Sequence, residues 1–376
     1  MEWKECQIKD VCRLINGRAY SNGEMLEHGK YKIVRVGNLS GGNSTWFYSD
    51  LELPEDKYCH NGDLLFAWAC TFGPHIWKED NTIFHYHIWK IVEDKNVVDR
   101  RFYYYYLKYA TGGFLGALNG SVMVHITKAS MEKMNIKIPK NLDDQRRIAS
   151  ILSSLDRKIE LNNKINADLE EMAQAIFKNW FVDFEPFKDG KFVDSELGMI
   201  PEGWKVGTLG ELCNFKRGKN LLTKNAIDEG VPVVAGGLEP SCYHNVANTG
   251  APVITVSGSG ANAGFMRMYH VPVWASDCSF IDISCENFYF VYCFLKVNSK
   301  LLKHAQTGAV QPHVKPSDIH DFELLIPDKE SIYDFQDKVK PFFDKIASIQ
   351  KENSRLSLLR DTLLPRLMSG ELEVPE

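Results

Sequence analysis

Residues 142 to 180 read LDDQRRIASILSSLDRKIELNNKINADLEEMAQAIFKNW, a stretch that contains neither proline nor glycine. Large apolar residues recur in it every three to four positions, the spacing of one face of an α-helix. This stripe carries Ile148, Leu152, Leu155, Ile159, Asn162, Asn166, Leu169, Ala173, Ile176 and Trp180. So narrow a stripe predicts a helix that pairs with a single partner helix, and at about 1.5 Å per residue it would be roughly 57 Å long.

The partner of this helix is expected in the same chain, because the sequence repeats itself. Three blocks recur in the same order. Trp3–Cys12 resembles Trp204–Cys213, each followed by a glycine (Gly17 and Gly218), and Gly120–Ile126 resembles Gly308–Val314. The helix itself aligns with a second helical segment, which places Gln145 on Gln336, Ile148 on Val339, Leu155 on Ile346 and Asn162 on Asn353. The chain is therefore predicted to be a tandem repeat of a globular part followed by a long helix.

Both globular parts are expected to mix strands and helices. Short apolar runs predict strands at Tyr31–Val36, Asp63–Trp68, Val231–Val234 and Pro252–Val256. Aromatic runs predict short helices at Phe102–Leu107 and Phe288–Leu295. Each part ends with a strand that closes in Ile-Pro, and a helix start follows it. The expected capping residues are Asn141 with Asp144, and Ser331 with Asp334.

The predicted fold class is α+β: two mixed α/β globular domains joined by two long helices in a pseudo-twofold tandem repeat. The helices are expected to form an antiparallel coiled coil, since parallel helices would require a nearly fully extended connection between them. The seam residues are Ile148, Leu152, Leu155, Ile159, Asn162, Leu169, Val339, Ile346, Asn353 and Leu363. The predicted segments are residues 1–141, helix 142–181, a surface linker 182–200, residues 201–327, and a helix with a tail at 328–376.

Composition indicates an ordinary cytoplasmic protein, with 44% hydrophobic and 25% charged residues. The sequence contains neither an apolar run long enough to cross a membrane nor a signal peptide, and its nine cysteines form no CxxC pairs. The net charge of −5 excludes binding of nucleic acid through charge alone. The first globular part is the most basic segment, so any affinity for DNA must come from local patches or from partner subunits.

The sequence offers weak candidates for catalysis. The glycine-rich run Ser257–Gly264 lacks the spacing of a dinucleotide fingerprint, and no Lys-Ser/Thr pair follows it. His85 with His87, and Cys59 with His60, each lack a second ligand pair, so structural roles are favoured over a metal site. Walker A, HExxH and adenine-methylation motifs do not occur. The sequence therefore predicts no catalytic residues and no metal site.

Five motifs carry a resemblance to a known family. They are Leu142–Ala149 (LDDQRRIA), Leu155–Ile159, Phe177–Phe184 (FKNWFVDF), Leu197–Trp204 (LGMIPEGW) and Leu363–Leu372 (LLPRLMSGEL). Together with the repeat, they make the whole chain resemble the DNA-specificity (S) subunit of type I restriction-modification systems. The second helix departs from the QRRIA pattern and reads QDKVK at Gln336–Lys340. This departure leaves the fold intact but weakens the expectation of partner contacts there.

The resemblance implies a non-catalytic subunit whose two target recognition domains each read half of a split site in double-stranded DNA. The paired helices would act as a ruler and as the docking surface for methyltransferase subunits, two being expected. A separate restriction subunit would complete the complex. S-adenosylmethionine, ATP and Mg²⁺ would be bound by these partners and not by this chain, and no membrane association is expected.

The repeat predicts a bipartite and asymmetric DNA site, because the two globular parts differ in most residues. A helical spacer of this length predicts a non-specific gap on the order of six base pairs between the half-sites. Bases are read by polar side chains in the grooves, and phosphates are held by cations and backbone N–H groups. The residues expected to contact DNA are Arg18, Tyr20, Arg35, Asn38, Thr71 and His125 in the first domain, and Arg217, Lys219, Ser257, Ser259, Asn262, Arg267 and His313 in the second.

Two other functions remain open at this stage. One is a single-chain methyltransferase or nuclease with an unrecognised site, which would modify DNA when given S-adenosylmethionine alone. The other is a coiled-coil scaffold without DNA recognition of its own. Salt-dependent and sequence-selective DNA binding by an assembled complex distinguishes the scaffold from a specificity subunit.

Overall fold

The structure, a computed structural model, describes residues 1–39, 44–69, 72–117, 126–306 and 312–375. The chain divides into two compact units, and the boundary falls inside both long helices. Unit 1 comprises Met1–Leu161 together with Asn353–Glu376, and unit 2 comprises Asn162–Glu352.

Unit 1 is built around two four-stranded sheets. The first is antiparallel, with the order β2 (Cys12–Asn16), β9 (Ile88–Glu93), β6 (Leu64–Ala67) and β7 (Gly73–Ile76). The second has the order β4 (Phe47–Ser49), β3 (Tyr31–Val34), β8 (Thr82–Phe84) and β5 (Tyr58–Cys59), in which β3 and β8 are parallel. Every residue of β6 is buried, which explains why its sequence is continuously apolar instead of alternating.

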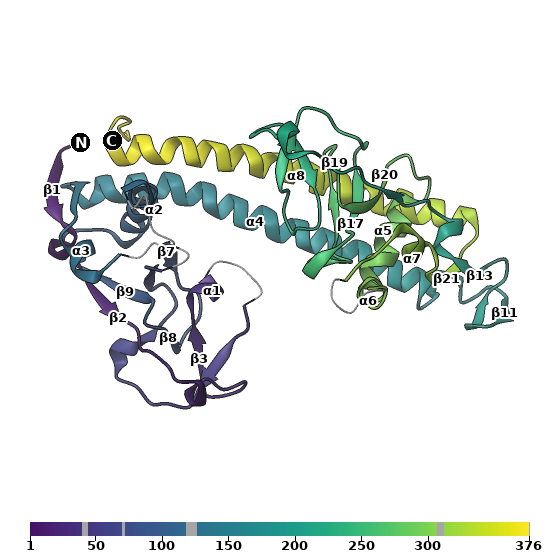
Figure 1. Ribbon diagram of the computed structural model, residues 1–376, viewed down its shortest axis with the longest axis horizontal. Helices are drawn as coiled ribbons and strands as arrows, with labels where there is room; N and C mark the ends of the chain where they lie inside the picture. Colours follow the sequence, from purple (N-terminus) through teal and green to yellow (C-terminus); the bar gives the residue numbers. More distant parts are fainter. Residues whose placement is uncertain (40–43, 70–71, 118–125, 307–311, 376) are drawn as a thin grey trace. The chain divides into compact units, whose positions relative to one another are not determined.

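An antiparallel ribbon and helices complete unit 1. The ribbon pairs β1 (Trp3–Gln7) with β10 (Asn135–Pro139), and the short helices are α1 (Val36–Leu39) and α3 (Lys128–Glu132). Helix α2 (Arg100–Ala117) contributes the buried aromatic residues Phe102 and Tyr103 to a core that also contains residues of both long helices. The two ends of the chain lie together in this unit, where the terminal amine pairs with Glu373 at 3.2 Å (Figure 1).

Unit 2 repeats this topology. Its antiparallel sheet has the order β14 (Lys216–Arg217), β20 (Cys278–Asp282), β17 (Val253–Ser257) and β18 (Met266–Tyr269). A smaller sheet has the order β16 (Cys242–His244), β15 (Val231–Val234) and β19 (Trp274–Ala275), with β15 and β19 parallel. An antiparallel ribbon pairs β13 (Lys205–Thr208) with β21 (Glu323–Ile326).

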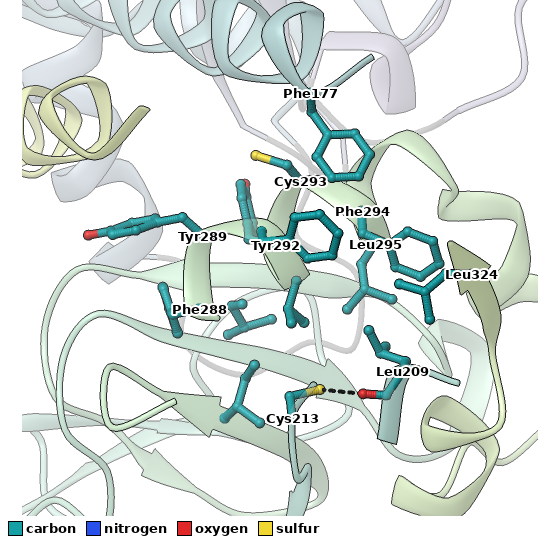
Figure 2. Packing of buried hydrophobic residues seen from close by; sticks show 14 of the residues in the cluster. Phe177, Leu209, Cys213, Phe288, Tyr289, Tyr292, Cys293, Phe294, Leu295 and Leu324 are labelled. Atoms are coloured by element: carbon teal, nitrogen blue, oxygen red, sulfur yellow. Dashed lines mark hydrogen bonds between the residues drawn. The ribbon is translucent and has the colours of Figure 1, made fainter. Parts of the chain in front are cut away.

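Three helices cover unit 2: α5 (Phe288–Val297), α6 (Ser299–His304) and α7 (Pro316–His320). All residues from Phe288 to Leu295 are buried, so α5 is surrounded by apolar groups on every side. Figure 2 shows Phe288, Tyr289, Tyr292 and Phe294 of this helix packed with Phe177 of a long helix, above the Cys213 thiol that donates to the Leu209 carbonyl at 3.5 Å. The aromatic run predicted from sequence is thus the centre of the core of unit 2.

The tandem repeat is confirmed, since each sheet, each ribbon and the aromatic helix of unit 1 has a counterpart in unit 2 in the same order along the chain. The strands predicted at residues 63–68, 231–234 and 252–256 are present within one residue or two. The strand predicted at Tyr31–Val36 ends two residues early. The Asn38 side chain accepts a hydrogen bond from the Arg35 amide at 3.0 Å and turns the chain into α1.

The long helices α4 (Leu142–Phe181) and α8 (Lys329–Ser369) are antiparallel within each unit. In unit 1, Arg147 near the start of α4 donates to the carbonyl of Pro375 at 3.0 Å. Asp156 lies further along α4 and pairs with Arg360, an earlier residue of the chain than Pro375, at 2.8 Å. Residue numbers thus rise along α4 while those of its partners fall. In unit 2, Asn162 donates to Glu352 at 2.9 Å, and the ring of Phe177 lies 5.7 Å from that of Phe335. The predicted antiparallel pairing is confirmed.

The seam residues differ in burial. Ile148, Leu152, Asn162, Val339 and Ile346 are buried, whereas Leu155, Ile159, Leu169, Asn353 and Leu363 are half-buried. Asn162 has a partner in Glu352, the neighbour of Asn353 in the chain. Asn353 belongs to the other unit, and its pairing with Asn162 stays a prediction.

The predicted start of α8 was wrong. The helix begins at Lys329, and Asp328 caps it by accepting hydrogen bonds from the Ser331 amide and hydroxyl, both at 2.8 Å. Ser331 is therefore the third helical residue and not the cap. The aspartate carboxylate provides the acceptor that the unpaired amides of a helix start require.

The connection between α4 and unit 2 is more ordered than the predicted surface linker. It contains a hairpin of β11 (Phe192–Ser195) and β12 (Gly198–Pro201). Phe184 and Phe187 pack against the Trp204 ring with centroid separations of 5.6 and 5.0 Å. The apolar residues among the prolines and glycines of this segment thus extend the core of unit 2.

A glutamine in the first turns of each long helix, buried in unit 1 and half-buried in unit 2, joins the globular part to that helix. In unit 1 the Gln145 amide donates to the carbonyls of Val97 and Pro139 at 3.1 and 2.8 Å, and its oxygen accepts from the Asp99 amide at 2.8 Å. Gln145 is fully buried, so water cannot replace these backbone groups as partners of its amide.

The equivalent Gln336 makes the corresponding contacts in unit 2. Its oxygen accepts from the Tyr289 amide at 3.0 Å, and its nitrogen donates to the Glu286 carbonyl at 2.9 Å. In both units the glutamine therefore bonds to the backbone at the start of the aromatic helix, which explains why the repeat aligns these two residues.

A carboxylate on α4 forms a second attachment in each unit. In unit 1 the Tyr105 hydroxyl donates to Asp156 at 2.6 Å, and Arg360 pairs with the same carboxylate. In unit 2 the Tyr292 hydroxyl donates to Glu170, which also pairs with Lys296 at 2.8 Å. Burial raises the pKa of both tyrosines, so the hydroxyls stay protonated and act as donors.

The glutamine attachment predicts a large loss of stability for Gln145→Met. Methionine fills a similar volume but leaves three backbone groups, of which that of Pro139 is buried, without this partner, which should lower the free energy of unfolding by about 2–4 kcal/mol. Urea denaturation of the whole chain measures this change, with Lys164→Met at an exposed position of α4 as the matched control. A loss below about 1 kcal/mol, the size of an ordinary substitution, would show that the glutamine does not hold the unit together.

Candidate nucleic-acid interface

The two repeated glycines mark the same end of the sheet in each unit. Gly17 follows β2, and a Cβ atom there would overlap the carbonyl of His85 in the β8–β9 connection. Gly218 follows β14, and a Cβ atom there would overlap the carbonyl of Ser276 in the β19–β20 connection. Glycine is needed at both positions because two backbone segments touch. Of the residues predicted to contact DNA, Arg18 and Arg217 lie directly beside these glycines.

In unit 2 the loop after β17 brings three predicted residues together. The Ser257 hydroxyl and the Asn262 amide both donate to the Gly236 carbonyl at 3.3 Å. The Gly260 amide donates to Pro312 at 3.1 Å, and a β-bridge pairs Ser259 with His313. The glycine-rich run is therefore a loop in close contact with neighbouring backbone. Its glycines allow this close approach, and their spacing is not that of a dinucleotide-binding loop.

Asp277 joins this loop to the strand β14. Its carboxylate accepts hydrogen bonds from the Ser259 hydroxyl and from the guanidinium of Arg217, and its backbone carbonyl accepts from the Gly258 amide at 3.0 Å. Asp277 was not predicted from the sequence, because a single aspartate between two short strands carries no motif. The signal that could have identified Asp277 is its position directly after Ser276, whose backbone lies against Gly218.

Arg217, Ser257, Ser259, Asn262 and His313 thus form one polar cluster, whereas Lys219 and Arg267 lie to its sides. Lys219 is exposed, and its carbonyl accepts from the Trp274 indole at 2.8 Å. Arg267 donates to the Leu238 carbonyl and pairs with Glu239, both at 2.9 Å. Five of the seven residues predicted for the second domain are therefore brought together.

In unit 1 the predicted residues are more strongly involved in the fold. Arg18 pairs with Glu24 at 2.6 Å, and this hydrogen bond lowers the pKa of the Glu24 carboxyl to about 2. Tyr20 is buried against Ile33, Tyr58 and Ile83, and burial raises its pKa. Tyr20 is a core residue, and its side chain lacks the exposure that the predicted contact with DNA requires.

Arg35 and Asn38 hold the turn into α1. The Asn38 amide nitrogen donates to the Ser44 carbonyl at 3.3 Å, and Arg35 donates to the Thr45 carbonyl at 3.1 Å while stacking on Phe47. Both side chains therefore have structural partners. Thr71 and His125 lie outside the described residues, and their predicted roles stay predictions.

An aromatic cluster occupies the crossing in unit 1 and was not predicted as a site. The Trp68 indole donates to the Tyr86 carbonyl at 2.9 Å, and its ring lies 5.1 Å from that of His87. The rings of His85 and Tyr86 are 4.4 Å apart, and Tyr86 is 40% exposed. An exposed ring at this end of a sheet is suited to stacking or apolar contact with bases.

Both histidines of this cluster are held in the neutral form. Burial lowers the pKa of His85 to about 4, with further lowering by His87 and Arg35, and burial also lowers the pKa of His87. A neutral imidazole can donate or accept a hydrogen bond but cannot bind a phosphate by charge. Among the described residues no group of three or more His, Cys, Asp or Glu is arranged to hold a metal ion.

The chain contains two copies of one mixed α/β unit on two long antiparallel helices. Each copy has polar or aromatic loops at the same end of its sheet. This arrangement defines a two-domain recognition protein. Comparison with known proteins identifies the family. The model of the type I restriction modification DNA specificity domain matches residues 1–171 and again residues 201–357. The chain belongs to this family. In the described part of the chain no helix is both long and apolar enough to cross a membrane.

Individual relatives agree with this assignment. The chain is 30% identical to the type I restriction enzyme MjaIX specificity subunit of Methanocaldococcus jannaschii, over 76% of this chain and 72% of that protein. It is 26% identical to the type I restriction enzyme HindI specificity subunit of Haemophilus influenzae, over 99% of this chain and 100% of that protein. The crystal structure of a type I restriction-modification system S subunit from M. genitalium has the same fold, with a TM-score of 0.60 at 20% identity over 98% of this chain and 96% of that chain.

The depressed pKa of His85 predicts a pH dependence of stability. The folded pKa of about 4 lies below the ordinary value of 6.5, so the unfolded chain binds the proton more readily between these pH values. The stability contributed by neutral His85 is complete above pH 6.5 and is lost as the pH falls toward 4. His85→Phe should therefore show a smaller loss of stability between pH 7 and pH 4.5 than the parent chain.

Urea denaturation at several pH values measures this difference, with His28→Phe at an exposed position of unit 1 as the control. If His85→Phe and the parent chain lose stability in parallel, His85 is not held neutral by the fold.

Proposed function

We propose that this chain is the non-catalytic subunit that gives a type I restriction-modification complex its DNA sequence specificity, in the prokaryotic cytoplasm. Each unit would read one half of a bipartite site in double-stranded DNA. The observation that carries the proposal is the repeat of one topology, with the polar cluster of unit 2 and the aromatic cluster of unit 1 at equivalent crossings. Because these two clusters differ chemically, the half-sites should differ in sequence.

The long helices would bind the partner subunits. In unit 1 they expose the large apolar residues Leu161, Leu358 and Leu359, and in unit 2 they expose Met172 and Tyr333. Leu358 and Tyr333 are 70% and 69% exposed and would supply apolar contact area to a partner subunit. Methyltransferase subunits, two in number, would cover this surface, and restriction subunits would join the complex.

The partners would carry the chemistry. S-adenosylmethionine would bind to the methyltransferase subunits, and ATP with Mg²⁺ to the restriction subunits. This division fits a chain whose polar clusters consist of hydrogen-bonded serine, asparagine, arginine and aspartate side chains at the ends of sheets. The DNA-binding roles of Arg18, Arg35, Lys219, Arg267 and the residues of the polar cluster belong to this proposal.

Methylome sequencing of a host that expresses this chain with its genomically neighbouring methyltransferase tests the proposal. We expect methylated adenines in an asymmetric motif of two short half-sites, separated by a non-specific gap on the order of six base pairs. The same host without this chain should lack the motif. A continuous or palindromic motif would contradict the proposal, and so would a motif that persists without this chain.

A further inference from the structure

The guanidinium of Arg217 in unit 2 is held in a fixed orientation by its neighbours. Arg217 ends the two-residue strand β14 at the crossing marked by Gly218. Its guanidinium is bonded to Asp277, and a Cβ atom on Gly258 would overlap it, so the group lies directly on the backbone of the loop after β17. The side chain is nevertheless 46% exposed.

Most of the donors of this guanidinium remain available. An arginine carries five N–H donors in a planar fork, and Asp277 is the one acceptor that Arg217 contacts among the described residues. The other arginine of unit 2 differs, since Arg267 is engaged by Leu238 and Glu239. Arg18 in unit 1 is engaged by Glu24 and is 34% exposed. Arg217 is thus the arginine of these three with the largest exposed fraction, and like Arg18 it has a single acceptor.

Charge favours a base over a phosphate as the ligand. The ion pair of Arg217 and Asp277 has no net charge, and a carboxylate beside the guanidinium repels a phosphate. A base edge is neutral, and its acceptor atoms can be recognised by an oriented donor pair. Two parallel N–H donors match the O6 and N7 atoms of guanine in the major groove, which is the commonest specific contact of arginine with DNA.

We propose that Arg217 reads one guanine of the half-site bound by unit 2, and that Asp277 and Gly258 are positioning residues that fix its guanidinium. Ser259 completes the arrangement, since its hydroxyl donates to the same carboxylate and limits the rotation of Asp277. This inference rests on the proposed function, because it requires that unit 2 contacts DNA bases.

The test is methylome sequencing of the assembled complex with substitutions in the full-length chain. Arg217→Gln should relax the motif at one guanine position of one half-site, lowering the discrimination there by roughly 5- to 150-fold. Asp277→Asn, which keeps the size of the side chain, and Gly258→Ala should relax the same position to a smaller extent. The other half-site should stay unchanged in all three variants.

Arg13→Lys, at an exposed position of β2 in unit 1, is the control and should leave that guanine position intact. Thermal unfolding and co-purification with the methyltransferase show whether each variant folds and assembles. A purely structural role for Arg217 predicts lower stability with an unchanged motif, and this result would overturn the inference.

Two further results would also overturn it. A uniform loss of methylation across all sequences, with a weaker dependence on salt, would identify Arg217 as a phosphate contact. A half-site of unit 2 without guanine would exclude the assigned base. In each of these cases the parent complex still methylates a bipartite motif, so the proposed function stands. If the parent complex methylates no bipartite motif, the proposed function itself fails.

Discussion

The attachment of each globular part to its long helix depends on one glutamine, buried in unit 1 and half-buried in unit 2. Gln145 and Gln336 satisfy backbone groups at the start of an aromatic helix, and they do so from the first turns of α4 and α8. A helix alone could rotate beneath the domain that it carries, because apolar packing is not directional. Hydrogen bonds to fixed backbone groups remove this freedom. The tyrosine–carboxylate contacts of Tyr105 and Tyr292 add a second fixed point in each unit.

Fixed attachment matters for a protein that recognises DNA by orientation. Base-specific contacts require donors and acceptors to meet within a few tenths of an ångström. In both units the loops that bear polar or aromatic side chains lie where the chain at Gly17 or Gly218, directly after a strand, touches a neighbouring connection. The framework is therefore shared, while the side chains at the crossing differ. This is the arrangement expected of a family in which new DNA sequences are recognised by changing loops and not the fold.

Most of the fold could be predicted from the sequence because its signals are local or repeated. The apolar stripe through Ile148 and Leu152 predicts a helix, the repeat predicts its partner helix, and the short connection predicts that the two are antiparallel. Errors arose where a tertiary contact decides a boundary, as with Asp328 at the start of α8 and Asn38 after β3. The site was harder to predict. Tyr20 and Arg217 are both polar residues near a repeated glycine, and only the structure shows that one is buried and the other exposed.

The central claim is that each globular part independently specifies one half-site. A chimera in which a second copy of residues 3–139 replaces residues 204–327 tests this claim most directly, because Gln336 can then make the contacts that Gln145 makes in unit 1. The chimera is expressed with the methyltransferase, and its methylated motif is sequenced. The account predicts a symmetric motif, with the half-site of unit 1 present twice in inverted orientation. A motif that retains the original half-site of unit 2 would contradict it.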